Sequence, residues 1–252
     1  MKILAITQAR IGSTRLPNKV LKKIGEKTLL QMHLERVQRS KLINQLIVAT
    51  TDEIGVEGIV EVANLVGIKT FKGNLNDVLD RFYSAYKIFG ADAIVRVTSD
   101  CPLIDPSLID SVIKLFCDSG HDYVSNTLNP TFPDGVDVEV FKATALEQAW
   151  HEATLKSDRE HVSAYIWKNS TFLGKDKFKS SCFENNPNYS QYRLTVDTPD
   201  DFVRIEKLVE MIGDDGPWLD YVSCIQEHED IFDKIKAEER NLGYKKSLER
   251  DK

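Results

Sequence analysis

Two hydrophobic periods alternate along the first half of the chain. Short runs of consecutive apolar, often β-branched residues are typical of strands that are buried on both faces. Longer segments with apolar positions three to four residues apart are typical of amphipathic helices. The predicted strands are 2–7, 45–50, 68–71 and 92–98, and the predicted helices are 28–40, 56–67, 76–90 and 107–117. This order predicts right-handed crossovers and a three-layer α/β fold, with a mostly parallel sheet and helices on both faces.

The pattern becomes less regular after Asp122. We predict a strand, a loop and a second strand within 123–141, and then helices at 143–155 and 157–169, a strand at 191–197 and a helix at 199–213. We therefore expect one domain over residues 1–230 with an insertion in its second half. Residues 231–252 are nearly all polar and are predicted to be a frayed helix or a solvated tail. An arm that contacts a partner is the alternative.

Composition narrows the classes of partner. The 252 residues carry a net charge of −6, which argues against a nucleic-acid-binding surface. The four cysteines have no paired spacing and no metal-site spacing, and we expect most of them to be reduced core residues. They are Cys101, Cys117, Cys182 and Cys224. No apolar stretch approaches the length of a membrane span. We expect a cytoplasmic protein without a membrane or nucleic-acid partner.

The loop after the first strand, "ITQARIGSTRLPNKVL", concentrates positive charge. It carries three cations and two small residues: Arg10, Arg15, Lys19, Gly12 and Ser13. In open parallel sheets ligands bind at the carboxyl ends of the strands, where this loop begins. Its backbone N–H groups and cations suit phosphate oxygens, although neither G-x-x-x-x-G-K-[ST] nor G-x-G-x-x-G is present. The alternative is a solvated basic turn.

Two aspartates at predicted strand ends are candidate metal ligands. Asp105 is explained as a helix N-cap before Pro106, whereas Asp100 lies before any helix start. Asp197 likewise precedes a helix cap, predicted at Thr198. Carboxylates are the ligands that Mg²⁺ prefers, and two of them on separate strands would hold Mg²⁺ against a triphosphate. An Asx turn is the alternative for Asp100.

Six stretches in order resemble the SpsF-like cytidylyltransferases, a family named after a spore coat polysaccharide biosynthesis protein. They are "QARIGSTRLPNKVL", "DVLDRFYSA", "VRVTSDCPLID", "SNTLNPTFPDGVDVEVF", "REHVSAYI" and "LTVDTPDDF". The likeness extends from Met1 to about Gly213. The family is related to the enzymes that make CMP-Kdo and CMP-acylneuraminate.

The resemblance implies a fold of the nucleotide-diphospho-sugar transferase (GT-A) type. It also implies that CTP and a 2-keto sugar acid are converted to a CMP-sugar and pyrophosphate for surface polysaccharide biosynthesis, with Mg²⁺. Relatives often pair as dimers, and the oligomeric state of this chain stays open between a monomer and a homodimer. Arg10, Gly12, Ser13, Arg15 and Lys19 would contact the triphosphate, and Asp100 and Asp197 would hold Mg²⁺. Arg15, Lys19, Asp100 and Asp197 would be catalytic. Thr50, Thr51, Asp77 and Arg81 would lie near the nucleoside.

The acceptor side is less defined. The residues expected to face the second substrate are Asn126, Asp137, Glu139, Arg159, Glu160, His161 and Tyr165. Arg159 suits a sugar carboxylate, because a guanidinium binds a carboxylate through two parallel hydrogen bonds. The alternatives are a packed histidine at His161 and a first-turn ion pair between Arg159 and Glu160.

Two other functions fit the same residues. A glycosyltransferase that uses a nucleotide sugar would share the fold. Such enzymes usually carry an Asp-x-Asp motif, whereas "TSDCP" offers one Asp, at Asp100. A non-catalytic nucleotide- or sugar-binding partner would have no need of both metal-binding carboxylates, Asp100 and Asp197. The residues therefore favour nucleotidyl transfer.

Overall fold

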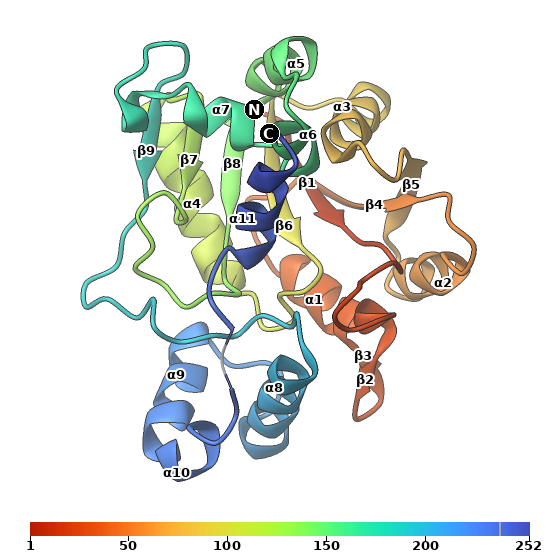
Figure 1. Ribbon diagram of the computed structural model, residues 1–252, viewed down its shortest axis with the longest axis vertical. Helices are drawn as coiled ribbons and strands as arrows, with labels where there is room; N and C mark the ends of the chain where they lie inside the picture. Colours follow the sequence, from red (N-terminus) through yellow and green to blue (C-terminus); the bar gives the residue numbers. More distant parts are fainter. Residues whose placement is uncertain (237) are drawn as a thin grey trace.

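A seven-stranded mixed sheet forms the centre of the computed structural model, which describes residues 1–236 and 238–252 (Figure 1). The strands are β1 (Ile3–Gln8), β4 (Gln45–Thr51), β5 (Lys69–Gly73), β6 (Ala93–Thr98), β7 (Tyr123–Ser125), β8 (Glu139–Lys142) and β9 (Ser180–Cys182). Their order is β5-β4-β1-β6-β8-β7-β9, and β8 runs antiparallel to both of its neighbours. The other pairs are parallel, so the predicted mostly parallel sheet is confirmed.

Helices cover both faces of the sheet because successive side chains of its strands point to opposite sides. Ile3 and Ala5 of β1 pack with α1, α4, α8 and α9, while Leu4 and Ile6 pack with α3, α5 and α7. The helices are α1 (Leu29–Val37), α2 (Glu57–Leu65), α3 (Val78–Phe89), α4 (Pro106–Ser119), α5 (Ala143–Glu152), α6 (Lys156–Glu160), α7 (Ala164–Lys168), α8 (Pro199–Ile212), α9 (Trp218–Glu227), α10 (Glu229–Phe232) and α11 (Leu242–Glu249). Two short 3-10 helices, η1 (Lys19–Leu21) and η2 (Thr171–Leu173), and a small hairpin of β2 (Lys23–Ile24) and β3 (Lys27–Thr28) complete the elements.

The predicted helix caps are confirmed. The Asp105 side chain accepts hydrogen bonds from the backbone N–H groups of Ser107 and Leu108 at the start of α4. Thr198 and Asp201 form a capping box at the start of α8. Asp105 and Asp201 therefore stabilise the first turns of α4 and α8.

The strand predicted at 191–197 is absent, and this part of the described chain is irregular apart from an isolated bridge between Asp134 and Arg193. The reason is that its backbone meets loops and not a free strand edge. Leu194 N–H donates to Asp134 O at 2.6 Å, and Val196 N–H donates to Asp100 O at 2.8 Å. Gly135 makes the close approach feasible, because a Cβ there would lie 2.4 Å from the backbone of Leu194.

The single helix predicted at 157–169 is two helices. A break separates α6 from α7, and Val162 within it has φ +55°, a left-handed conformation that no helix interior adopts. Local hydrophobic periodicity does not report such a turn. The break points the end of α6 toward the carboxyl edge of the sheet.

The C-terminal residues are folded. Residues 242–249 form α11, which packs against α6 and lies in front of β6 and β8 in Figure 1. Ser247 of α11 is buried. A helix is therefore present where a frayed helix or a solvated tail was expected, and the difference is that polar contacts to the body of the protein hold this helix in place. Residue 237, inside the predicted tail, lies outside the described residues.

The expected burial of the cysteines is only half confirmed. Cys101 and Cys224 are buried, but Cys117 is exposed and Cys182 is half-buried, so only half of the cysteines are core residues. Among the described residues, the helices are all too short or too polar to cross a bilayer.

Candidate active site

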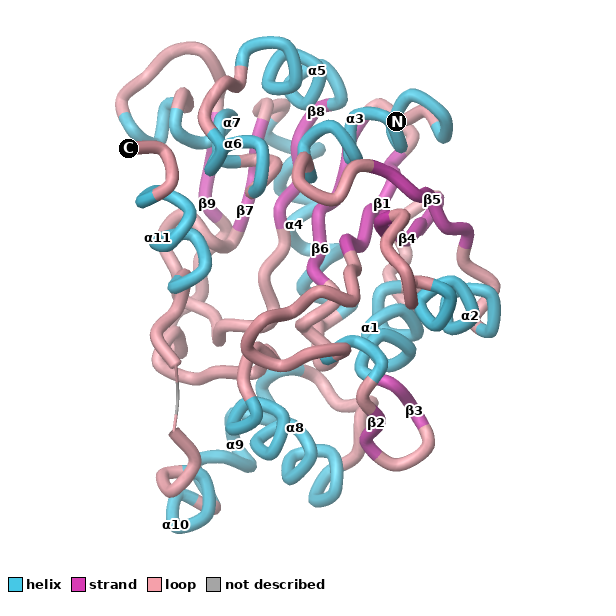
Figure 2. The backbone as a smooth tube through the Cα atoms, turned by 45° about the vertical axis from the view of Figure 1, so that its right-hand side comes forward, coloured by secondary structure: helices cyan, strands magenta, loops and turns pink. Residues whose placement is uncertain are grey.

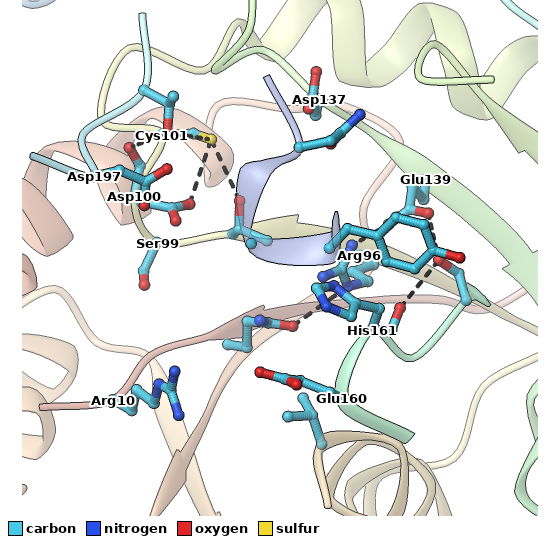
Figure 3. Close-up of a pocket in the computed structure, with 18 of the residues that line it drawn as sticks. Arg10, Arg96, Ser99, Asp100, Cys101, Asp137, Glu139, Glu160, His161 and Asp197 are labelled. Carbon is cyan, nitrogen blue, oxygen red and sulfur yellow. Dashed lines mark hydrogen bonds and ion pairs between the residues drawn. The ribbon is translucent and has the colours of Figure 1, made fainter. Parts of the chain in front are cut away.

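A cavity of about 960 Å³ opens at the carboxyl ends of β1 and β6 (Figure 3). Its walls come from the loop after β1, the start of α3, the residues after β6, α6 and the segment that carries α11. This is the edge of the sheet at which the sequence predicted a ligand site.

Lys19 joins the two candidate metal ligands. Its Nζ lies 3.0 Å from Asp100 Oδ2 and 2.8 Å from Asp197 Oδ1, and it also donates to Val196 O at 2.9 Å. The first-strand loop and both aspartates therefore converge on one point, although they are about 80 and 180 residues apart along the chain.

This cluster is electrostatically coupled. Burial by itself would raise the pKa of Asp100, but the adjacent Lys19 ammonium and the Thr98 hydroxyl hold it well below its ordinary value. Burial would lower the pKa of Lys19, yet the two carboxylates raise it above its ordinary value. Lys19 and Asp100 are therefore both charged at neutral pH.

Arginines fix the second aspartate. Arg193 is 5% exposed and its Nη2 lies 3.1 Å from Asp197 Oδ2, while it also pairs with Asp134 and Asp201. Arg15 Nη2 lies 3.1 Å from the other oxygen, Asp197 Oδ1. Because Oδ2 is held from behind, Oδ1 is directed toward Lys19 and Arg15.

A buried histidine supports the Asp100 turn. His33 of α1 lies between Thr7 Oγ1 of β1 and the carbonyl oxygen of Cys101, at 2.9 Å from each. The side chain is fully buried, and this desolvation lowers the pKa of His33 to about 4, against the weaker opposite effect of the Cys101 hydrogen bond.

Stability should fall in mild acid because of His33. The unfolded histidine takes up a proton below its ordinary pKa of 6.5, whereas the folded one stays neutral down to about 4. The stability that neutral His33 contributes is complete above pH 6.5 and is lost as pH falls from 6.5 toward 4. Between pH 7 and pH 5 the free energy of unfolding should fall by about 2 kcal/mol for this reason. In urea titrations, His33→Gln should lose correspondingly less stability over this range than the natural protein.

The exposed His151 provides the control for that replacement. His151→Gln should leave the acid-dependent loss as it is in the natural protein. Equal losses in His33→Gln and the natural protein would contradict the assignment.

The two aspartates fit a magnesium ion. They already hold a cation, the Lys19 ammonium, between hard carboxylate oxygens. Within the described residues no three His, Cys, Asp or Glu side chains gather as a complete metal site. Mg²⁺ commonly uses one or two carboxylates and takes its remaining ligands from phosphate and water. Asp100 and Asp197 are therefore suited to a metal that arrives with a phosphate-bearing substrate.

The residues predicted to bind nucleotide are only partly gathered at the cavity. Arg10, Ser13, Arg15, Lys19, Asp77 and Arg81 line it. In the described part of the chain the lining does not include Gly12, Thr50 or Thr51. Both threonines are fully buried, and Thr51 Oγ1 donates to Glu53 at 2.7 Å. Their position beneath the site reflects the tight packing of β4, which a pattern of residues cannot show.

Asp77 and Arg81, which were predicted to lie near the nucleoside, also make contacts that stabilise the fold. Asp77 caps α3 through Asp80 N–H at 2.9 Å and also pairs with Arg159 Nε at 2.5 Å. Arg81 donates to the carbonyl oxygens of Asn74 and Leu75. Burial, with Arg10 nearby, lowers the pKa of Arg81 to about 10. These contacts hold the loop after β5 against the start of α3.

Five of the seven predicted acceptor residues line the same cavity: Asp137, Glu139, Arg159, Glu160 and His161. Asn126 and Tyr165 are not among its described lining residues. The Asn126 amide is buried and bonds Val136 O at 2.9 Å and Val138 N at 2.8 Å, so it ties two backbone segments together. Tyr165 instead contacts Glu152 and Lys177 on α5 and the loop before β9.

The acceptor-side residues are held in a hydrogen-bond network. Glu139 pairs with Arg96 and accepts from Tyr123 and Ser163. The alternative of an ion pair between Arg159 and Glu160 is not what these two described residues form: Arg159 bonds Asp77, and Glu160 Oε2 accepts from Ser247 at 2.8 Å.

His161 lies beside this network and is packed. Its Nε2 lies 2.9 Å from Ser247 Oγ, and the Tyr244 ring stands edge-on to it with ring centroids 5.1 Å apart. Burial, with Arg96 nearby, lowers the pKa of His161 to about 4. His161 is therefore neutral at pH 7 and acts as a hydrogen-bonding group.

Asp137 differs from its neighbours. Desolvation raises the pKa of Asp137 to about 7, which the Arg240 guanidinium opposes and the carboxylates of Asp134 and Glu139 reinforce. Arg240 pairs directly with it. The Asp137 carboxyl therefore holds its proton to a higher pH than an ordinary aspartate.

Several residues that line the cavity were not predicted from the sequence: Arg96, Asp134, Lys156, Arg193, Tyr244 and Arg250. Arg96 and Arg193 each interrupt an apolar strand-like run with a charge, and this signal was present in the sequence. Tyr244 and Arg250 belong to the polar C-terminal segment, where no local pattern indicated a site.

Comparison with known proteins identifies the family. The cytidylyltransferase family model matches residues 4–237, almost the whole chain. The chain belongs to the cytidylyltransferase family. As a member of it, the protein is a CTP-dependent nucleotidyltransferase, and the resemblance drawn from the six sequence stretches is confirmed.

Individual relatives agree with the family. The spore coat polysaccharide biosynthesis protein SpsF of Bacillus subtilis is 35% identical over 218 residues, 84% of this chain and 88% of SpsF. A cytidylyltransferase structure from Leptospira borgpetersenii superimposes with a TM-score of 0.87 at 32% identity, covering 95% of this chain and all of that one. The CTP complex of CMP:2-keto-3-deoxy-manno-octonic acid synthetase gives a TM-score of 0.62 at 17% identity, over 84% and 99% of the two chains. This last likeness concerns the fold alone.

Proposed function

We propose that this cytidylyltransferase transfers CMP from CTP to a 2-keto sugar acid, giving a CMP-sugar and pyrophosphate for surface polysaccharide biosynthesis. The observation that carries the proposal is the convergence of Lys19, Arg15, Asp100 and Asp197 on one side of a large cavity. Cations for a triphosphate and carboxylates for its metal ion are thereby placed together. The relatives named above include a polysaccharide biosynthesis protein and a synthetase of a CMP-linked sugar acid.

In the proposed reaction the loop cations bind phosphate and the two aspartates bind the metal ion. Arg10, which forms no ion pair within the described residues, together with Arg15 and Lys19, binds the triphosphate and offsets the charge of the departing pyrophosphate. Asp100 and Asp197 hold Mg²⁺, which when bound neutralises phosphate charge and favours in-line attack at the α-phosphorus. Arg193 keeps Asp197 in position from behind. Most of the acceleration comes from positioning and charge, so we assign no general base.

The opposite end of the cavity suits an anionic sugar. Lys156 lines it and has no ion-pair partner among the described residues, and Arg250 has only a 3.4 Å contact, with Glu160. Arg96, Arg159 and Arg240 are each paired with a carboxylate. Lys156 and Arg250 therefore offer charge to a sugar carboxylate, while Glu160 and Asp137 offer acceptors to hydroxyl groups.

A substrate screen tests the proposal. The protein is incubated with each of the four nucleoside triphosphates, with and without Mg²⁺, and with 2-keto sugar acids or the corresponding neutral sugars. We expect pyrophosphate release with CTP and one acid, at least about tenfold faster than with another triphosphate, because a site built to pair with one base leaves polar groups unpaired with others.

The controls separate substrate class from reaction class. Release with CTP and a neutral sugar would refute the acid and leave cytidylyl transfer standing. Sugar transfer from a nucleotide sugar, without pyrophosphate release from any triphosphate, would refute the proposed reaction.

A further inference from the structure

The C-terminal segment, residues 238–252, folds back across the mouth of the cavity. Its first residues contact the two ends of the site: Glu238 pairs with Arg15 of the first-strand loop, and Arg240 pairs with Asp137 on the acceptor side. Figure 2 shows the chain rising from α10 to α11, which ends beside α6. The segment follows directly after residue 237, at which the family match ends.

The far end of the segment is anchored independently of those two pairs. Ser247 Oγ lies 2.9 Å from His161 Nε2 and donates to Glu160 at 2.8 Å, and Asp251 accepts from the Ser157 N–H at 2.9 Å. A change at Glu238 would therefore loosen the start of the segment, which Arg240 still ties to Asp137 and to Phe132 O, while α11 keeps its contacts with α6.

Arg15 is fully engaged by carboxylates. One of its terminal nitrogens contacts Asp197 at 3.1 Å, and the other contacts Glu238. The pair is open to water, with the two side chains 29% and 24% exposed, so exchange of partners does not require opening of the core. A guanidinium binds carboxylate and phosphate oxygens with the same geometry. A phosphate that binds the Nη1 side of Arg15 therefore takes the position that Glu238 occupies.

We propose that Glu238 is an internal competitor of the nucleotide for Arg15, and that nucleotide binding detaches the start of the C-terminal segment from the site. The inference rests on the proposed function, which assigns Arg15 to the triphosphate. A triphosphate carries several negative charges against one on Glu238, so the exchange favours the nucleotide. Because coupling is reciprocal, the contact that weakens nucleotide binding is also the one that nucleotide binding breaks.

Nucleotide titration of two neighbouring variants tests this competition. Isothermal calorimetry with CTP and Mg²⁺ should show Glu238→Gln binding CTP about three- to fivefold more tightly than the natural protein, the range expected for loss of one partly exposed ion pair. Glu239→Gln is the matched control, because Glu239 pairs with Lys245 of α11 and both side chains are more than half exposed. Its affinity for CTP should be unchanged.

Limited trypsin cleavage after Arg240 supplies the structural readout, because the Arg240 side chain is held by Asp137 and by Phe132 O when the segment is docked. Addition of CTP and Mg²⁺ should speed this cleavage in the natural protein, and Glu238→Gln should be cleaved faster than the natural protein before CTP is added. Equal or weaker CTP affinity in Glu238→Gln, with CTP bound by the natural protein, would overturn the competition and leave the proposed function intact. Absence of CTP binding in every form would overturn both.

Discussion

Lys19→Met should lower the rate of pyrophosphate release from CTP about a thousandfold, the size of effect seen when one charge-stabilising group is removed from an active site. Methionine keeps the length and packing of the side chain but removes the ammonium that joins Asp100 and Asp197. The two carboxylates then face each other without a counter-charge, and the triphosphate loses one cation. Initial rates with CTP and the acceptor found by the substrate screen measure the loss.

The split between kinetic constants identifies the role of Lys19. A group that acts mainly on the departing pyrophosphate should lower kcat more than it raises the KM for CTP. Lys23→Met is the control, because Lys23 is an exposed lysine of the nearby hairpin and lies outside the cavity. A Lys19→Met protein that retains a tenth or more of the natural rate would show that the ammonium only stabilises the fold.

The largest effect on stability should come from Arg193. Its guanidinium is 5% exposed and pairs with Asp134, Asp197 and Asp201, of which Asp201 is completely buried. Arg193→Met leaves these carboxylates without their counter-charge in a poorly solvated place. We expect the free energy of unfolding in urea to fall by about 3–5 kcal/mol, the usual range when one partner of a buried ionic group is removed.

An exposed ion pair provides the comparison. Arg39 contacts Asp215 at 2.8 Å, with side chains 46% and 84% exposed, so Arg39→Met should cost less than about 1 kcal/mol. The cost of Arg193→Met should also shrink in acid. Burial would raise the pKa of Asp201, but Arg193 lowers it below its ordinary value of 3.8, so this contribution is lost as pH falls through that region. An equal loss of unfolding free energy in Arg193→Met and Arg39→Met would contradict a stabilising role for the ion pairs of Arg193.

Local chemistry was readable where its cause is local. Asp105 and Thr198 were identified as caps because the capping side chain and the N–H groups it binds lie within three residues. The strands β1, β4 and β6 were predicted because both of their faces are largely buried, so each contains a run of consecutive apolar residues. The strand predicted at 191–197 failed for the opposite reason, since a strand requires a partner edge and this segment found loops.

The site residues likewise divide into those that local sequence predicted and those that depend on distant contacts. The loop cations and Asp100 were identified because parallel strands place their carboxyl ends at one edge of the sheet. Asn126 was predicted to bind substrate from its residue type and motif. Its side-chain amide instead hydrogen-bonds the backbone of residues 136 and 138, which the sequence pattern could not indicate. Which polar side chain faces a cavity and which faces the protein depends on contacts made far along the chain.

The sequence by itself determined the α/β class, the edge of the sheet at which the cavity opens and the basic and acidic groups that meet there, because periodicity and strand-end position are properties of short segments. Only the tertiary structure decided that Lys19 lies between Asp100 and Asp197, that Arg193 holds Asp197 from behind, and that a polar C-terminal segment forms a wall of the cavity. Charge pairing between distant residues is set by their separation in space, and that separation exists only once the chain has folded.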